Sequence, residues 1–162
     1  MTSHFYQGVP DLKTLKLWHS QFPGPKICVF DDLSQEMLTG SNLHFSEQLS
    51  TVYAHHFNFL FCHILHHLFN KDLRQLSLNT HYFLIPDYKR DKSQIMNLAR
   101  QMFPQKSPIF MKVYDDAIKS SKNVGELKYG YCLVCCHPQC DDLRIFTCIL
   151  PSQAPIIAYE IL

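Results

Sequence analysis

A short apolar run that stops on two adjacent acids constrains this chain more than any other stretch. Ile27–Phe30 follows Pro25 and ends at Asp31 and Asp32, within KICVFDDLSQEM. A run this short, bounded by a proline and by charge, is typical of a buried strand. Two neighbouring carboxylates repel each other, and each is costly to desolvate. We therefore expect the pair either to lie in water or to meet a positive charge that offsets this cost.

Further short apolar runs alternate with helical patterns along the chain. This alternation predicts an α/β sheet whose strands are buried on both faces. We expect the other strands in FNFLFCHIL, at His81–Ile85, and in YGYCLVCC and RIFTCIL, the last two as an antiparallel hairpin with IIAYEI as an edge strand. We expect helices in Asp11–Phe22, capped by Asp11, in HFSEQLSTVYAHH, in DKSQIMNLARQMF after a cap at Asp91, and in PIFMKVYDDAIKSS, with Pro108 in its first turn.

The composition bounds the class of protein. The chain has 162 residues, 46% of them hydrophobic and 18% charged, which is typical of a globular protein. We expect an irregular lead-in over residues 1–25 and one α/β domain over residues 26–162. The net charge of +1 gives no overall basic field for nucleic acid. No stretch has the length or composition of a signal peptide or a membrane span, so seven cysteines favour reduced thiols inside a cell or virion, in nucleus or cytoplasm.

Several motifs in one order carry a family resemblance. They are ICVFDDLSQEM, LSTVYAHHFNFLFCHILHHLF, SLNTHYFLI with RDKSQIMNLARQMFP, and the cysteine-rich hairpin. Together they resemble the C-terminal half of the genome-packaging ATPases of double-stranded DNA viruses, poxviruses among them, and of virus-like transposons of the Polinton and adintovirus kind. These enzymes form part of the FtsK/HerA-like group. The resemblance covers nearly the whole chain and implies a partial P-loop NTPase sheet of the RecA/ASCE type, flanked by helices, with a C-terminal β-hairpin.

The resemblance also implies roles for individual residues. Asp31 and Asp32 match the Walker B acids, so Asp31 would hold Mg²⁺ bound to ATP and Asp32 would polarise the attacking water. His55 and His56 match the family's His-His pair, and Arg90 matches an arginine that senses phosphate or acts in trans on a neighbouring subunit. From the residues alone, two alternatives remain equally open. Asp31 and Asp32 could simply be solvated, and Arg90 could form an ion pair with Asp91 at the start of a helix.

Other positions depart from the family pattern. None of the five glycines precedes a lysine, so the Walker A loop that cradles phosphates is missing, and the resemblance places it upstream of this segment. His66 and His67 stand where the family has a γ-phosphate-sensing Gln and an Asn. Phe57 replaces an Arg. We therefore expect a truncated or degenerate packaging ATPase, inactive alone, which would work in a homo-oligomeric ring or with a complementing ATPase subunit and would meet DNA as the family does.

Two further readings remain open from the residues. The same fold could serve as a non-catalytic interaction module. Alternatively, Cys132, Cys135, His137 and Cys140 could bind zinc, but Cys132 and Cys135 point to opposite faces of a strand. We favour buried thiols over zinc. The resemblance also removes the central strand between Phe59–Leu65 and His81–Ile85, so those strands are expected either to expose an edge each or to pair with each other.

Overall fold

The computed structural model describes residues 3–69, 71–124, 128–140 and 143–161, and their contacts group into two compact units, Met1–Asn79 and Thr80–Leu162. The first unit holds α1 (Leu12–Gln21), β1 (Lys26–Asp31), α2 (Ser34–Met37), α3 (Ser41–Gln48), the π-helical turn η1 (Leu49–Tyr53), α4 (Ala54–Phe57), β2 (Phe59–Ile64), the 3₁₀ turn η2 (Lys71–Leu73) and α5 (Arg74–Leu78). The second holds β3 (Tyr82–Pro86), α6 (Lys92–Met102), α7 (Ser107–Asn123), β4 (Tyr131–Cys135), β5 (Leu143–Thr147) and β6 (Ile157–Glu160). The fold is therefore mixed α/β, and most expected elements form where the sequence places them.

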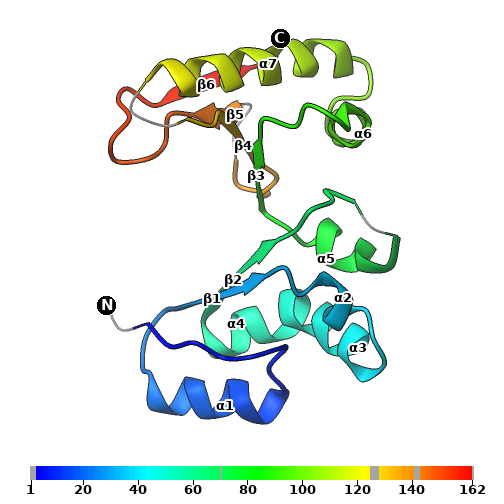
Figure 1. The fold of residues 1–162 in the computed structure, drawn as a ribbon, viewed down its shortest axis with the longest axis vertical. Helices are drawn as coiled ribbons and strands as arrows, with labels where there is room; N and C mark the ends of the chain where they lie inside the picture. The colour runs from blue at the N-terminus through cyan, green and yellow to red at the C-terminus, as the bar shows by residue number, and fades with distance from the viewer. Residues whose placement is uncertain (1–2, 70, 125–127, 141–142, 162) are drawn as a thin grey trace. The chain divides into compact units, whose positions relative to one another are not determined.

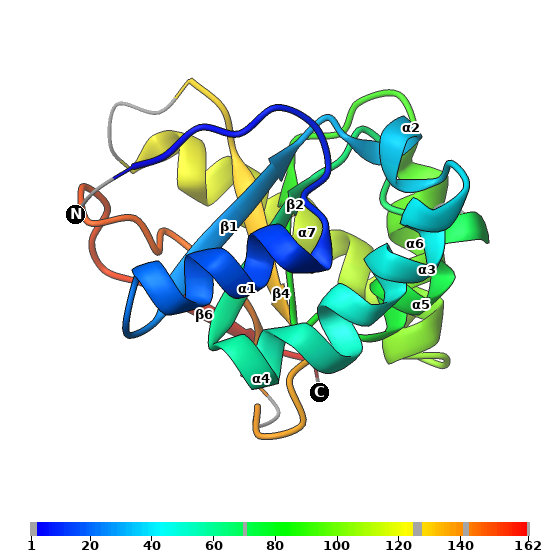
Figure 2. The same cartoon turned by 90° about the horizontal axis from the view of Figure 1, so that it is seen from below.

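The first unit is built on a parallel pair of strands. β1 pairs with β2 from Lys26 opposite Phe59 to Asp31 opposite Ile64. Helices on one side of this pair form the core, in which Leu15 of α1 and Leu49 of η1 pack with Phe30 and Phe59. Figures 1 and 2 show α1 and α4 on this side of the two strands. Burial of these large apolar side chains is the main stabilising contribution to the unit.

Local signals in the sequence explain where the helices of the first unit begin. The Asp11 carboxylate accepts a hydrogen bond from the Thr14 N–H at 2.8 Å, so it is the N-cap that the sequence predicts for α1. The helix expected around Leu49 and Tyr53 forms as a continuous run from α3 through η1 to α4. It ends at Asn58, which adopts the left-handed conformation that asparagine tolerates.

The opposite face of the β1–β2 pair corrects the expectation of burial on both faces. Ile27 and Val29 of β1 are 58% and 55% exposed, and Leu60 and Ile64 of β2 are 58% and 50% exposed. A continuous apolar run does predict a strand covered on two sides, as in parallel sheets generally. Within the described residues of the first unit, however, helices cover one side alone, so the unit itself leaves the second, aliphatic face uncovered.

The second unit is a four-stranded antiparallel sheet in the order β3-β4-β5-β6, with α7 packed along it (Figure 1). This confirms the expected hairpin and the edge strand near the C-terminus. The phenol of Tyr114 in α7 donates to the Pro86 carbonyl at 2.8 Å and accepts from the Tyr88 N–H at 3.0 Å, which ties the end of β3 to the helix. Gly130 lets β4 approach α7, because a Cβ there would lie 2.3 Å from the Ile118 carbonyl oxygen.

The outer strands of the two sheets, β1 and β2 in the first unit and β3 and β6 in the second, each have one unpaired edge among the described residues. β2 pairs with β1 but has no neighbour on its other side, and β3 pairs with β4 but has none on its other side. The sequence analysis left two arrangements open for β2 and β3, and the structure shows the one in which each strand exposes an edge instead of pairing with the other. Unpaired edges of apolar strands attract further strands, from a partner or from an aggregate.

We predict that the isolated chain is marginally stable and exposes an apolar surface. Circular dichroism should give a melting midpoint below about 55 °C, within the lower range of ordinary domains. The dye 8-anilinonaphthalene-1-sulfonate should bind the folded chain, and Leu60→Lys should weaken this binding more than Leu17→Lys, since Leu17 is equally exposed but lies on α1, outside the β1–β2 pair. A cooperative melt well above 55 °C without dye binding would contradict the prediction.

Candidate functional site

Two acids lie at the carboxyl end of β1, as the sequence predicts. Asp31 is the last residue of the strand and lies opposite Ile64, and Asp32 follows with a backbone φ of 52°. Its N–H donates to the Ile64 carbonyl at 3.4 Å, so the turn leaves β1 while still attached to β2. Left-handed backbone is uncommon outside glycine, although aspartate tolerates it better than most residues. Such conformations concentrate at functional sites, which makes Asp32 a candidate on geometry.

His66 is the residue that the structure brings to these acids. It follows β2, and its Nε2 lies 3.2 Å from Asp32 Oδ1. The side chains of His66 and Asp32 are 76% and 66% exposed, and exposed ion pairs add little to stability. The contact therefore indicates where two polar groups from neighbouring parallel strands meet, at the end of an α/β sheet where ligands commonly bind.

His63 contributes a second, partly buried histidine near the same end of β2. Its ring stacks on Phe30 with centroids 4.8 Å apart and planes 6° apart. Neither ring nitrogen has a hydrogen-bond partner among the residues described. Burial lowers the pKa of His63 from 6.5 to about 4, because a charged imidazolium would lose its hydration there. Our sequence analysis gave this residue no role in a site, and its alternation with Phe59 and Phe61 along β2 places it on their face of the strand.

The remaining sequence-predicted residues lie elsewhere. His55 and His56 are exposed on α4, which precedes β2, so they lie at the opposite end of that strand from Asp32. Six residues of strand separate the two ends, or roughly 20 Å. Arg90 is exposed after β3 in the second unit. No salt bridge joins Arg90 to Asp91 in the described residues; instead, the Asp91 carboxylate accepts from Gln94 Nε2 at 2.7 Å and from Ser93 Oγ at the start of α6.

The residues present do not form a complete site for Mg²⁺ and ATP. Carboxylates such as Asp31 and Asp32 are suitable ligands for Mg²⁺ that is already bound to phosphates. The described residues contain no group of three or more His, Cys, Asp or Glu side chains placed to hold a metal ion, and no glycine in the sequence precedes a lysine in a phosphate-binding loop. We therefore derive no catalytic step through magnesium nucleotide on this chain by itself.

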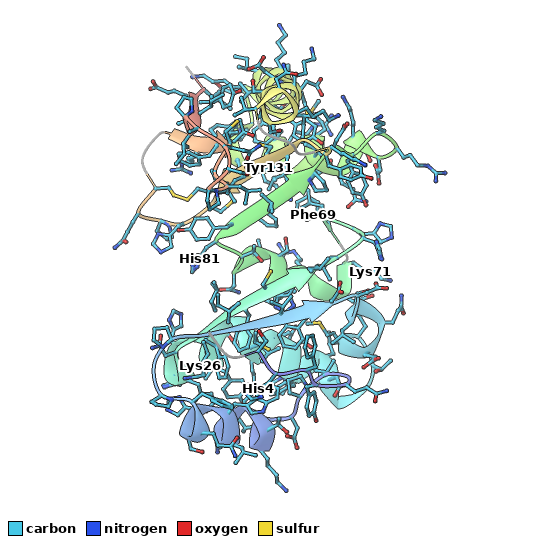
Figure 3. All side chains as sticks on the ribbon, turned by 60° about the vertical axis from the view of Figure 1, so that its left-hand side comes forward. His4, Lys26, Phe69, Lys71, His81 and Tyr131 are labelled. Carbon is cyan, nitrogen blue, oxygen red and sulfur yellow. A yellow bond between two sulfur atoms is a disulfide. The ribbon has the colours of Figure 1, made fainter. Side chains whose placement is uncertain are left out.

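The cysteine-rich hairpin of the second unit has a different chemistry from the one expected. Cys135 and Cys140 are joined by a disulfide, visible as a yellow sulfur–sulfur bond in Figure 3, so they are not both reduced thiols. Burial raises the pKa of Cys132 to about 12, which keeps that thiol protonated. The ring of His137 lies 4.7 Å from that of His81, the residue before β3. Two of the four residues weighed as zinc ligands are thus held in a covalent bond.

Comparison with known protein families, with curated proteins and with solved structures finds no match to this chain. Within the described ranges, none of the helices has both the length and the hydrophobicity needed to cross a lipid bilayer. The resemblance to packaging ATPases therefore stays a prediction. The arrangement of Asp32 and His66 is the structural observation that bears on function.

We predict that His63 makes the first unit sensitive to acid. Its pKa is about 6.5 in the unfolded chain and about 4 in the folded one, so the unfolded state binds more protons between these values. Stability should be intact above pH 6.5 and should fall by up to about 3 kcal/mol as the pH drops towards 4, at about 1.4 kcal/mol for each unit of pKa. His63→Phe keeps the stack on Phe30 but cannot titrate. Urea denaturation at several pH values should therefore give a flatter profile for the variant, and identical slopes would contradict the prediction.

We predict that the purified chain holds one disulfide and five thiols. Seven cysteines are present, and Cys135 and Cys140 form the bonded pair. Titration with Ellman's reagent in denaturant should therefore detect about five thiols before reduction and seven after it. Cys140→Ser should release Cys135, so that all six remaining cysteines react without reduction. Seven reactive thiols in the unreduced wild-type chain would show that the pair is open.

Proposed function

We propose that this chain is the C-terminal half of the ATPase core of a DNA-packaging motor, truncated or degenerate, and that it does not hydrolyse ATP by itself. In this proposal Asp31 and Asp32 are the Walker B acids, His66 occupies the sensor position on the adjacent strand, and Arg90 acts on phosphate after β3. The Walker A loop comes from other polypeptide. The motor would act on DNA as an oligomeric ring.

One observation carries the proposal: the contact between Asp32 and His66 at the carboxyl ends of two parallel strands. The family resemblance implies that Asp32 polarises the attacking water and places His66 at the position of a γ-phosphate sensor, and the two residues lie 3.2 Å apart. The left-handed backbone at Asp32 adds to this, since strained residues cluster at active sites. The unpaired edge of β2 is also what the family's missing central strand would leave.

A second candidate function is a non-catalytic interaction module on the same fold. The observation in its favour is the aliphatic face of β1 and β2, which includes Val29 and Leu60 and has a charged side chain, Asp31, at its end. Exposed apolar faces of this kind mark protein interaction sites. This candidate has the same aliphatic face as the first and differs in having no role for Asp32.

The test is a chimaera in which this chain replaces the C-terminal half of an active packaging ATPase. The isolated chain should release no phosphate from ATP above background, because it lacks a phosphate loop. The chimaera should hydrolyse ATP, and Asp32→Asn should lower the rate at least 100-fold, since an amide cannot accept the proton of the attacking water. His66→Gln should raise the rate by restoring the amide that the family uses as a sensor.

Asp116→Asn is the matched control, because Asp116 is an exposed acid on α7 whose recorded partner is the Tyr159 hydroxyl. It should leave the rate of the chimaera within about twofold. A folded chimaera with no ATP turnover would favour the interaction module. Turnover by the isolated chain that depends on Asp32 would overturn the proposed dependence on a separate phosphate loop.

A further inference from the structure

Two features that lack partners, the outer edge of β2 and one face of the strands, meet on the same pair of strands; the outer edge of β1 is unpaired as well. The first is the outer edge of β2. The Lys26 N–H donates to the Asn58 carbonyl, and the Asp32 N–H donates to that of Ile64, which fixes the alternation of the ladder between them. The backbone groups of Phe59, Phe61 and His63 therefore face away from β1. No further strand pairs with this edge in the described chain.

The second feature is the aliphatic face, which we define as Ile27, Val29, Leu60, Cys62 and Ile64. All five side chains are exposed, four of them by half or slightly more, and none of the five is charged, although Asp31, which alternates with Ile27 and Val29 along β1, adds one carboxylate at the end of the same face. The exposed area amounts to roughly 400 Å², within the range of the largest patches on ordinary monomers. Parallel strands are normally covered on both faces, so an occupant that buries this face would complete the usual arrangement.

A second copy of the chain satisfies one of these features at a time. Two copies stacked face to face would bury about 400 Å² each, roughly half of the 800 Å² that each partner contributes to a stable interface. The edge of β2 would remain unpaired. Two copies joined edge to edge through β2 would pair the backbone groups but would leave both aliphatic faces in water.

A strand followed by a helix satisfies both features at once. The connection from β1 to β2 runs through helices on the Phe30 side of the sheet. Because helices already occupy the Phe30 side, a helix that follows a strand beyond β2 has the opposite face open to it, and a right-handed course from that strand across β1 leads to the same face. That face is the aliphatic one. The edge and the face are thus the two halves of one binding surface.

We propose that the first unit binds a strand–helix segment of a partner protein. Its apolar strand pairs in parallel with the outer edge of β2, and the apolar side of its helix covers the aliphatic face. The surface suits an uncharged, β-branched strand and an amphipathic helix, and it has no basic residue among its five side chains to attract nucleic acid or phosphate. The identity of the loop between this strand and helix as a phosphate loop rests on the proposed function. The docking itself rests on the unpaired edge of β2 and on the aliphatic face.

The experiment uses the full chain and a fluorescein-labelled synthetic segment containing the strand, phosphate loop and helix of a viral packaging ATPase. Fluorescence anisotropy should show saturable binding, and hydrogen exchange should slow at the amides of Phe61 and His63. Leu60→Lys should weaken binding at least tenfold, and the matched variant Leu17→Lys should change it less than twofold. A segment with proline in the middle of its strand should bind at least tenfold more weakly, because proline removes a ladder donor.

The segment is also made with its loop lysine changed to alanine, and ATP hydrolysis is measured beside binding. Equal binding of both segments supports docking whatever the rate of hydrolysis, so a failure of the proposed function appears as binding without turnover. Docking is overturned if the wild-type chain does not bind at about 100 μM segment, or if Leu60→Lys and Leu17→Lys weaken binding equally. It is also overturned if light scattering shows a dimer of the chain that Leu60→Lys dissociates.

Discussion

The parallel pairing of β1 with β2 is the constraint on which the rest of the first unit depends. Their register places Phe30 on the side that packs against Leu15 and Leu49, and it leaves Val29 on the other side. Because side chains alternate along a strand, a shift by one residue would exchange the two faces and lose the core. The same register places the carboxyl ends of both strands side by side, where Asp32 contacts His66. Core, docking face and candidate site thus follow from one pairing.

Local chemistry made much of this fold predictable from sequence. Asp11 caps α1 because its carboxylate reaches the Thr14 N–H three residues on, and Pro108 stands in the first turn of α7, where its missing donor costs nothing. The run Ile27–Phe30 forms a strand because it is short, apolar and bounded by breakers. These signals act over a few residues, so they do not depend on how distant segments meet.

Features set by distant contacts were less predictable. The apolar composition of β1 predicted that both faces of the strand would be buried. Burial depends on which other elements cover each face, and the sequence of the strand does not contain that information. The link between Cys135 and Cys140 depends on how the hairpin turns, which the spacing alone left open. The stack of His63 on Phe30 could not be predicted locally, because it needed the register of β1 with β2. The contact of His66 with Asp32 was not predicted, because it depends on how the carboxyl ends of two separate strands meet.

The exposure of the candidate site connects its chemistry to the docking surface. A carboxylate that is two-thirds exposed interacts with a nearby charge through water, where such interactions are worth about 1 kcal/mol at 4 Å. Catalysis by charged groups gains strength when water is excluded and the groups are held in place. Asp32 and His66 follow the two strands whose outer edge and aliphatic face lack partners. A strand that pairs in parallel with β2 would have its carboxyl end at the same end of the sheet as these two residues. Under the proposed function, binding of the partner segment and assembly of the site would then be the same event, since the site of the isolated chain is open to solvent.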